Sequence, residues 1–125
     1  MKILVFILSP TAKGGCEILT SSQSDGSYLI PSIEATENLQ SEALKYSQNL
    51  LNVNNIELLT YLGSVEDVHA YILRTIRAQL EVKQLMKLGF QFVSLNLSLS
   101  DNVQAEAQAF WKSLLDYTQE YMIWE

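Results

Sequence analysis

The chain has very few of the residues from which disulfides, metal sites and nucleophilic active sites are built. Its 125 residues include one cysteine and one histidine. The single cysteine, Cys16, excludes an internal disulfide and suits a reducing compartment. His69 has no cysteine or histidine near it at a zinc-ligand spacing. We therefore interpret Cys16 as a buried small hydrophobe and His69 as a packed or hydrogen-bonded residue of a strand.

Basic residues are also scarce. The chain has 8 Lys and Arg against 14 Asp and Glu, and its formal net charge is −6. Binding to nucleic acid by general attraction needs clustered basic residues, so this balance argues against it. No segment approaches the ~18 consecutive apolar residues of a membrane span. The sequence predicts a cytoplasmic protein without a membrane partner.

Glycine and proline are few, at 5 and 2 residues, and no glycine-rich phosphate loop is present. The sequence contains no repeat, linker or low-complexity tract, which predicts a single α+β domain over residues 1–125. The apolar core of the N-terminal segment is only residues 3–8. This run is short for a signal peptide, so it predicts a buried first strand.

Hydrophobic periodicity predicts short strands and helices along the whole chain. The predicted strands are residues 2–9, 16–22, 28–30, 56–62, 68–73 and 90–97. A helix is predicted over Asn38 to Leu51, with Glu37 or Asn38 at its cap and the asparagine-rich stretch 52–55 at its end. The strand at 68–73 is apolar on both faces, which is typical of a central strand.

The C-terminal third is predicted to be mainly helical. For residues 74–89 we favour a strand to about Arg77 and then a helix over residues 78–88 that ends at Gly89. A long final helix is predicted to begin at Ser100 or Asp101. Its apolar stripe consists of Val103, Ala107, Phe110, Trp111, Leu114, Tyr117 and Tyr121. The apolar C-terminus, formed by Tyr117, Tyr121, Met122, Ile123 and Trp124, packs the helix onto the sheet or leaves a patch for a second copy or another partner.

The most informative motif lies between Tyr28 and Val53. It resembles the Nudix box of the Nudix (nucleoside-diphosphate-linked) hydrolase family, whose pattern is G-x5-E-x7-R-E-U-x-E-E-x-G-U, where U is bulky and aliphatic. Aligned without a gap, Glu37 matches the first glutamate, Val53 matches the closing aliphatic residue, and Lys45 conservatively replaces the arginine. The predicted order of elements is also similar to that of the Nudix fold, an α/β/α sandwich with a mixed β-sheet.

The resemblance also identifies the groups that this chain lacks. In the family, three glutamates of the helix hold Mg²⁺ or Mn²⁺ against a substrate pyrophosphate. Here these positions hold Tyr46, Asn49 and Leu50, which offer a phenol, an amide and an alkyl group. Pro31 replaces the family's first glycine, and proline removes an N–H donor from the phosphate-binding turn. The resemblance therefore predicts a Nudix fold that has no metal cofactor and has lost pyrophosphohydrolase activity.

Such a protein is expected to bind a ligand without hydrolysing it. The expected ligand is a nucleotide-like small molecule or a protein partner, including a second copy of the chain. The candidate ligand-binding residues are Tyr28, Glu34, Glu37, Lys45 and Tyr46. The two tyrosines could face the cleft where the family stacks a nucleobase, or they could pack in the core. Glu37 and Lys45 could form the ion pair that braces the family's loop against its helix.

Two alternatives remain open from the sequence. The first is a diverged, metal-dependent pyrophosphohydrolase that binds Mg²⁺ or Mn²⁺ through relocated carboxylates. Those carboxylates would have to converge from Glu34, Glu42, Glu57, Glu66 and Asp67. In that case Glu66 or Asp67 is the candidate catalytic base. The second alternative is an unrelated small α+β protein in which the likeness to the box is coincidental.

Overall fold

The strand at the centre of the sheet is the apolar N-terminal segment. In the computed structural model, which describes residues 1–11, 15–75 and 82–121, β1 runs from Lys2 to Pro10. Every residue from Ile3 to Ser9 is buried. A strand that is covered on both faces needs apolar side chains at consecutive positions, which explains the unbroken apolar run. The predicted first strand is confirmed.

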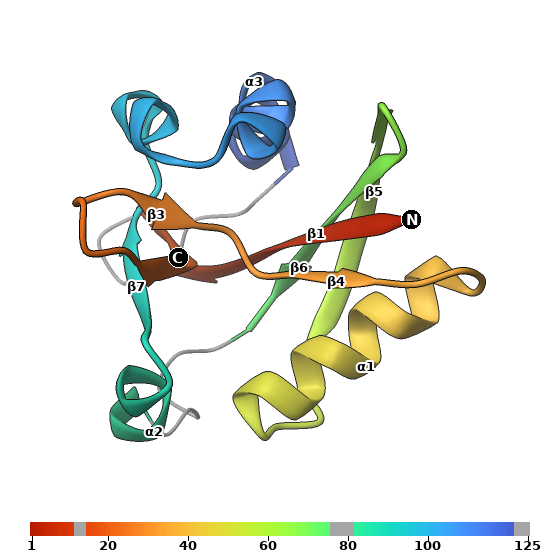
Figure 1. The fold of residues 1–125 in the computed structure, drawn as a ribbon, viewed down its shortest axis with the longest axis horizontal. Coiled ribbons are helices and arrows are strands. Elements are labelled where there is room, and N and C mark those ends of the chain that lie inside the picture. The colour runs from red at the N-terminus through yellow and green to blue at the C-terminus, as the bar shows by residue number, and fades with distance from the viewer. Residues whose placement is uncertain (12–14, 76–81, 122–125) are drawn as a thin grey trace.

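Strand β1 joins the other strands into one mixed, open sheet. The sheet order is β3 (Tyr28–Leu29), β2 (Cys16–Ser22), β1, β6 (Val68–Arg74) and β5 (Glu57–Val65), with β4 (Ser32–Glu34) on β1 and β7 (Phe90–Ser94) on β2. β6 is parallel to β1, and the other strand pairs are antiparallel. Figure 1 shows β5 and β7 toward opposite ends of the sheet. The prediction that 68–73 is a central strand is confirmed, because β6 lies between β1 and β5.

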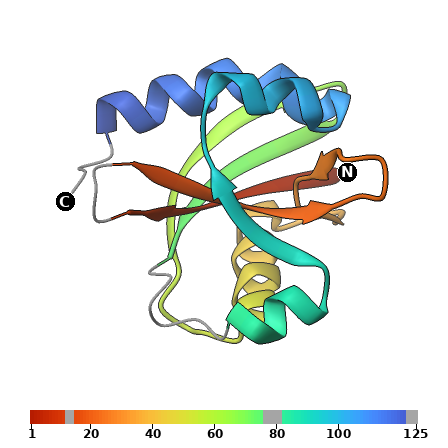
Figure 2. The same ribbon diagram turned by 90° about the vertical axis from the view of Figure 1, so that its left-hand side faces the viewer.

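Helices cover both faces of the sheet. α3 (Ala105–Tyr121) lies over one face, and α1 (Leu39–Leu51) and α2 (Val82–Lys87) lie over the other (Figures 1 and 2). Side chains alternate along β1, so each face of this strand contributes to a different apolar cluster. Leu4, Phe6 and Leu8 pack with α3, and Ile3, Val5 and Ile7 pack with α1 and α2. The predicted α/β/α sandwich with a mixed sheet is confirmed.

Asparagines in the left-handed conformation delimit α1. Asn38 precedes the helix with φ 53°, and its side chain makes no capping hydrogen bond. Asn52 follows the helix with φ 55°, and its backbone N–H donates to the Gln48 carbonyl oxygen. Asparagine is, after glycine, the residue that tolerates this conformation best. The predicted helix and its asparagine end are confirmed, and Asn38 holds the predicted cap position without capping through its side chain.

The start of the final helix differs from the prediction. Residues Leu97–Asn102 form a separate 3-10 helix, and α3 begins only at Ala105. The hydroxyl of Ser100 donates back to the Leu97 carbonyl oxygen at 2.8 Å. Because Ser100 bonds within its own turn, it does not cap the helix that follows. The prediction that the long helix begins at Ser100 or Asp101 is therefore wrong.

The β5–β6 connection is shorter than the predicted loop. β5 continues through Val65, which leaves Glu66 and Asp67 as a two-residue turn. Both turn residues have positive φ, 50° and 64°. A two-residue hairpin with positive φ at both central positions has a type I′ geometry that matches the twist of the strands. The predicted strands, 56–62 and 68–73, left residues 63–67 as the connection between them, and the structure shortens this connection to the two-residue turn.

The remaining elements agree with the prediction in part. β7 ends at Ser94, three residues before the predicted end of the strand. α2 lies within the predicted helix, and Gly89 follows it with φ 88°. The predicted strand end near Arg77 and the first turn of that helix fall on residues 76–81, outside the described residues, as do Met122, Ile123 and Trp124. No helix in the described part of the chain is long and apolar enough to cross a membrane.

Candidate functional site

The inner face of α1 anchors the helix that carries the box resemblance. Ala43, Ser47 and Leu51 are its buried residues, spaced four apart. The Ser47 hydroxyl donates to the Ala43 carbonyl oxygen at 2.9 Å, so this buried polar group is satisfied within the helix. Together with partly buried neighbours, this face packs against the cluster under α1 and α2. The rotation of α1 about its axis is set by this contact.

The rotation of α1 also decides whether the side chains at the three positions aligned with the box glutamates, Tyr46, Asn49 and Leu50, face the core or the solvent. Tyr46 and Leu50 are half-buried and pack against the same apolar cluster, whereas Asn49 is exposed. Burial raises the pKa of the Tyr46 phenol above its ordinary value, so the group stays neutral at physiological pH. A hard divalent cation needs several charged or carbonyl oxygen ligands. A packed phenol, an alkyl group and one exposed amide do not fit such an ion.

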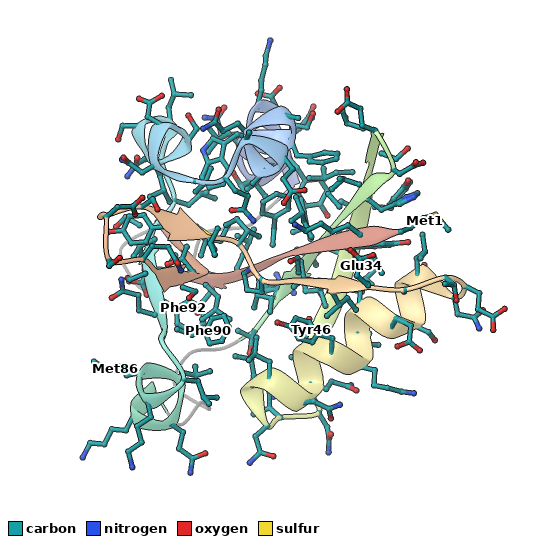
Figure 3. The ribbon with its side chains drawn as sticks, viewed as in Figure 1. Met1, Glu34, Tyr46, Met86, Phe90 and Phe92 are labelled. Atoms are coloured by element: carbon teal, nitrogen blue, oxygen red, sulfur yellow. The ribbon has the colours of Figure 1, made fainter. Side chains whose placement is uncertain are left out.

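An aromatic surface lies on the α1–α2 face of the sheet. Tyr46 of α1 and Phe90 and Phe92 of β7 are half-buried and pack against the cluster shared by α1 and α2. Figure 3 shows all three on that face of the sheet. Phe90 and Phe92 were predicted only as strand residues. Their spacing of two along a strand, which places both rings on one face, was the available signal.

Tyr28 lies on the opposite face of the sheet from Tyr46. It packs against the α3 cluster, and its backbone forms a bridge with Val103. Tyr46 packs against the other cluster. The sheet therefore separates the two tyrosines, and the predicted cleft containing both is wrong. The tertiary structure explains this: Tyr28 belongs to β3, at one end of the sheet, and its side chain packs on the face that α3 covers.

The predicted brace between Glu37 and Lys45 is not formed. Both side chains are exposed, and among the residues that the structure describes no ion pair joins them. Lys45 lies almost two turns beyond the cap residue Asn38, roughly 10 Å along the helix axis. Glu34 is exposed near the edge of the sheet, and its carboxylate is 3.7 Å from the amino group of Met1 (Figure 3). The structure thus does not bring Glu34, Glu37 and Lys45 together through ion pairs.

The acidic residues proposed as relocated ligands are dispersed. Glu57 pairs with Arg74 at 2.7 Å. Glu66 lines a shallow depression that also involves Glu106, whose carboxylate is paired with Lys2. Within residues 1–11, 15–75 and 82–121, no three acidic, histidine or cysteine side chains gather closely enough to hold a metal ion. The convergence required by the metal-dependent alternative is therefore not seen in this part of the chain.

The isolated histidine and cysteine behave as structural residues. His69 Nδ1 shares a 2.8 Å hydrogen bond with the Tyr61 hydroxyl, and the two rings stack at a centroid distance of 5.9 Å. Cys16 is 8% exposed, and burial raises the pKa of its thiol to about 12. A thiol with that pKa is a poor source of the nucleophilic thiolate. The buried position expected for Cys16 is confirmed, and His69 is hydrogen-bonded as expected but lies on a partly exposed part of the sheet, outside both apolar clusters.

A second depression lies at the start of α1, on the side facing β6. Its lining consists of Asn38, Leu39, Gln40, Ser41, Leu44 and Tyr71. The lining is a mixture of amides, a hydroxyl and apolar groups, without a charged side chain. It therefore offers no carboxylate or imidazole as a catalytic acid or base, and no anionic ligand for a cation.

Comparison with solved structures assigns the fold. A Nudix hydrolase from M. smegmatis, RenU, has a TM-score of 0.66, with 96% of this chain and 86% of that chain covered at 12% identity. A MutT/Nudix family protein from Listeria innocua has a TM-score of 0.70, with 95% and 92% covered at 11% identity. The C-terminal domain of mouse MUTYH, in a complex with human PCNA, has a TM-score of 0.58, with 94% and 88% covered at 14% identity.

These similarities are structural only. No protein-family model and no curated protein matches the sequence. At sequence identities of 11% to 14%, the likeness defines the fold and leaves the chemistry to the residues of the site. The chain has a Nudix-like α+β fold, with a mixed sheet flanked by helices.

Proposed function

We propose that this chain is a Nudix-fold binding module that does not hydrolyse pyrophosphates and needs no metal ion. Its ligand is a nucleotide-like molecule or a protein. The observation that carries the proposal is the packing of α1: Tyr46 and Leu50 occupy two metal-binding positions of the box and belong to the apolar packing of the molecule. Metal-assisted opening of a phosphoanhydride requires anionic oxygen ligands at this place, and Tyr46, Asn49 and Leu50 offer none.

The aromatic surface supports a nucleotide-like ligand. Tyr46, Phe90 and Phe92 are only half-buried, so part of each ring is accessible on the α1–α2 face. Stacking of a base on an aromatic ring contributes roughly 1–3 kcal/mol in nucleic-acid-binding proteins. Lys45, next to Tyr46 in the helix, is exposed and supplies a cation for a phosphate.

A neighbouring structure supports a protein ligand. The C-terminal domain of mouse MUTYH has a similar fold and was solved in a complex with the protein PCNA. The fold is therefore compatible with binding a protein. The surface that would serve this purpose in the present chain is considered in the next subsection.

Catalysis and binding are tested separately. Phosphate release is measured with a panel of nucleoside diphosphate derivatives in the presence of Mg²⁺ or Mn²⁺, and we expect none above the rate without protein. Turnover that disappears in Glu66→Gln or Asp67→Asn would overturn the proposal in favour of relocated carboxylates.

Binding is measured by thermal shift with the same panel in the absence of metal. A ligand that binds only the folded state raises the melting temperature, because binding shifts the folding equilibrium. We expect Tyr46→Leu to weaken the affinity for a stabilising nucleotide about tenfold, from lost stacking. Tyr28→Leu, on the opposite face, is the matched control and leaves the affinity unchanged. Equal losses in the two variants would contradict a site on the aromatic surface.

A further inference from the structure

The short helix α2 exposes apolar side chains that the fold does not use. Leu85 is its anchor, 4% exposed and packed in the cluster under α1 and α2. Two apolar residues that follow it are exposed: Met86, in the last turn of α2, is 64% exposed, and Leu88, just after the helix, is 63% exposed. Figure 3 shows Met86 projecting outward from α2. Because Leu85 fixes the inner face of the helix, Met86 cannot be buried without releasing that anchor.

Two lysines flank the exposed methionine. Lys83 and Lys87 are both exposed and stand four residues apart, which places them on one side of the helix beside Met86. Among the described basic residues, Lys2 and Arg74 are each tied to a glutamate. In the same part of the chain, neither Lys83 nor Lys87 makes an ion pair. Within the described residues, two lysines that make no ion pair therefore lie beside exposed apolar side chains, in a chain whose net charge is −6.

We infer that this α2 surface, formed by Lys83, Met86, Lys87 and Leu88, docks a segment of another protein that combines carboxylates with apolar anchors. The flexible thioether of methionine adapts to varied apolar partners and is enriched at protein interfaces. Carboxylates on the partner complement the two lysines, which steers association and sets its orientation. The inference deepens the protein-binding half of the proposed function, and it concerns a surface separate from Tyr46.

Charge distinguishes this occupant from others. Two copies that pair through the same surface about a two-fold axis bring like patches together, so Lys83 and Lys87 would face the lysines of the second copy. Like charges in such a contact are unfavourable. An anionic lipid surface attracts two lysines by about 1 kcal/mol each and also repels the net negative charge of the whole chain. The phosphates of nucleic acid could pair with the two lysines, but its backbone has no apolar side chains to pack against Met86 and Leu88.

The test uses the full chain and peptides selected by it. Random peptides displayed on phage are selected against the wild-type protein, and the enriched peptides are synthesised and titrated calorimetrically. We expect enriched peptides to carry Asp or Glu beside apolar residues. Met86→Ser/Leu88→Ser and Lys83→Glu/Lys87→Glu should each weaken binding at least about tenfold, as for residues at the centre of an interface. Exchanging the acidic residues of the peptide for lysine should restore binding to the Lys83→Glu/Lys87→Glu variant.

Matched controls lie on the opposite face of the molecule. Leu97 is 71% exposed in the 3-10 helix, and Lys112 is exposed on α3. Leu97→Ser and Lys112→Glu should leave peptide affinity unchanged. All substituted residues are exposed, so the variants are expected to fold like the wild type.

Several outcomes would overturn the inference. They are the absence of any enriched peptide, enriched peptides without acidic residues, and affinities that respond equally to the α2 and control substitutions. Light scattering that shows a dimer lost in Leu88→Ser would assign the surface to a second copy. Sedimentation with vesicles containing phosphatidylglycerol, but not with neutral vesicles, would assign it to a membrane. The α2 variants retain Tyr46, so nucleotides should raise their melting temperatures as much as that of the wild type. This measurement distinguishes a failure of the α2 surface from a failure of the proposed nucleotide site.

Discussion

Tyr46 shows how one side chain can change the role of a helix position. Its ring packs against the cluster under α1, and burial raises the pKa of its phenol. The side chain therefore contributes apolar contact in place of the negative oxygen that a divalent cation needs. At the scale of single residues, burial and hydrogen bonding decide how a given side chain contributes to stability. The two buried threonines of the sheet region illustrate this point.

Thr75 and Thr20 are predicted to respond in opposite directions to replacement by valine. The Thr75 hydroxyl is buried and has no hydrogen-bond partner among the residues that the structure describes, whereas the Thr20 hydroxyl donates to the Gln91 carbonyl oxygen at 3.3 Å. An unsatisfied buried hydroxyl destabilises the folded state, and a satisfied one stabilises it. We expect Thr75→Val to raise the free energy of unfolding by about 1 kcal/mol and Thr20→Val to lower it by about 1 kcal/mol. Urea unfolding measures both. If Thr75→Val lowers the free energy of unfolding, the Thr75 hydroxyl does have a hydrogen-bond partner in the folded protein.

At the scale of elements, the boundaries of α1 depend on backbone conformation. The residue at the last glycine position of the Nudix box is Asn52, and it adopts a left-handed conformation with φ 55°. Glycine and asparagine share the ability to end a helix in this way. Asparagine at this position therefore gives the same helix end that glycine would give.

Substitutions at Asn52 test this account of the helix end. Alanine strains the left-handed conformation, so Asn52→Ala should lower the free energy of unfolding by about 1 kcal/mol. Glycine adopts it freely, so Asn52→Gly should leave stability unchanged or raise it. Asn49→Ala, in the exposed interior of the same helix, is the control and should be neutral or slightly stabilising. Thermal or chemical denaturation gives all three values. A destabilised glycine variant would show that the Asn52 side chain, rather than its backbone, ends the helix.

At the scale of the whole molecule, the sheet separates two apolar cores that share one strand. Alternate residues of β1 enter the cluster beside α3 and the cluster beneath α1 and α2. If packing is lost in one layer, β1 is held less firmly in place, and the other layer, which packs on the same strand, is weakened too. This arrangement predicts that both layers unfold together.

Truncation of one leucine in each layer tests that coupling. Leu114 in the α3 layer and Leu73 in the α1 layer are both fully buried. Leu114→Ala and Leu73→Ala should each lower the free energy of unfolding by roughly 2–5 kcal/mol, from lost burial and the cavity left behind. Fluorescence and far-UV circular dichroism should report one coincident transition in both variants. Exposed Leu97→Ala should change stability by less than about 0.5 kcal/mol. Two resolved transitions in either core variant would show that the layers unfold independently.

Much of the secondary structure could be predicted from local sequence. The consecutive apolar residues of β1 and the two-sided pattern of β6 report burial on both faces, which few other structures need. The predicted hairpin strand 16–22 matches β2 in its bounds. Local patterns were less informative for β4, which was not predicted. A three-residue strand has too few positions for a period, and only its pairing with β1 defines it.

The candidate site could be predicted in composition but not in arrangement. The presence of Tyr46, Asn49 and Leu50 at the positions where the box resemblance would place glutamates is a property of the sequence alone, because no fold can supply a carboxylate that the chain lacks there. Only the tertiary structure decided that Tyr28 and Tyr46 lie on opposite faces and that Phe90 and Phe92 share a face with Tyr46. The chain order of residues does not reveal the face of a sheet on which a distant helix packs, since that choice depends on how buried surfaces from all elements fit together.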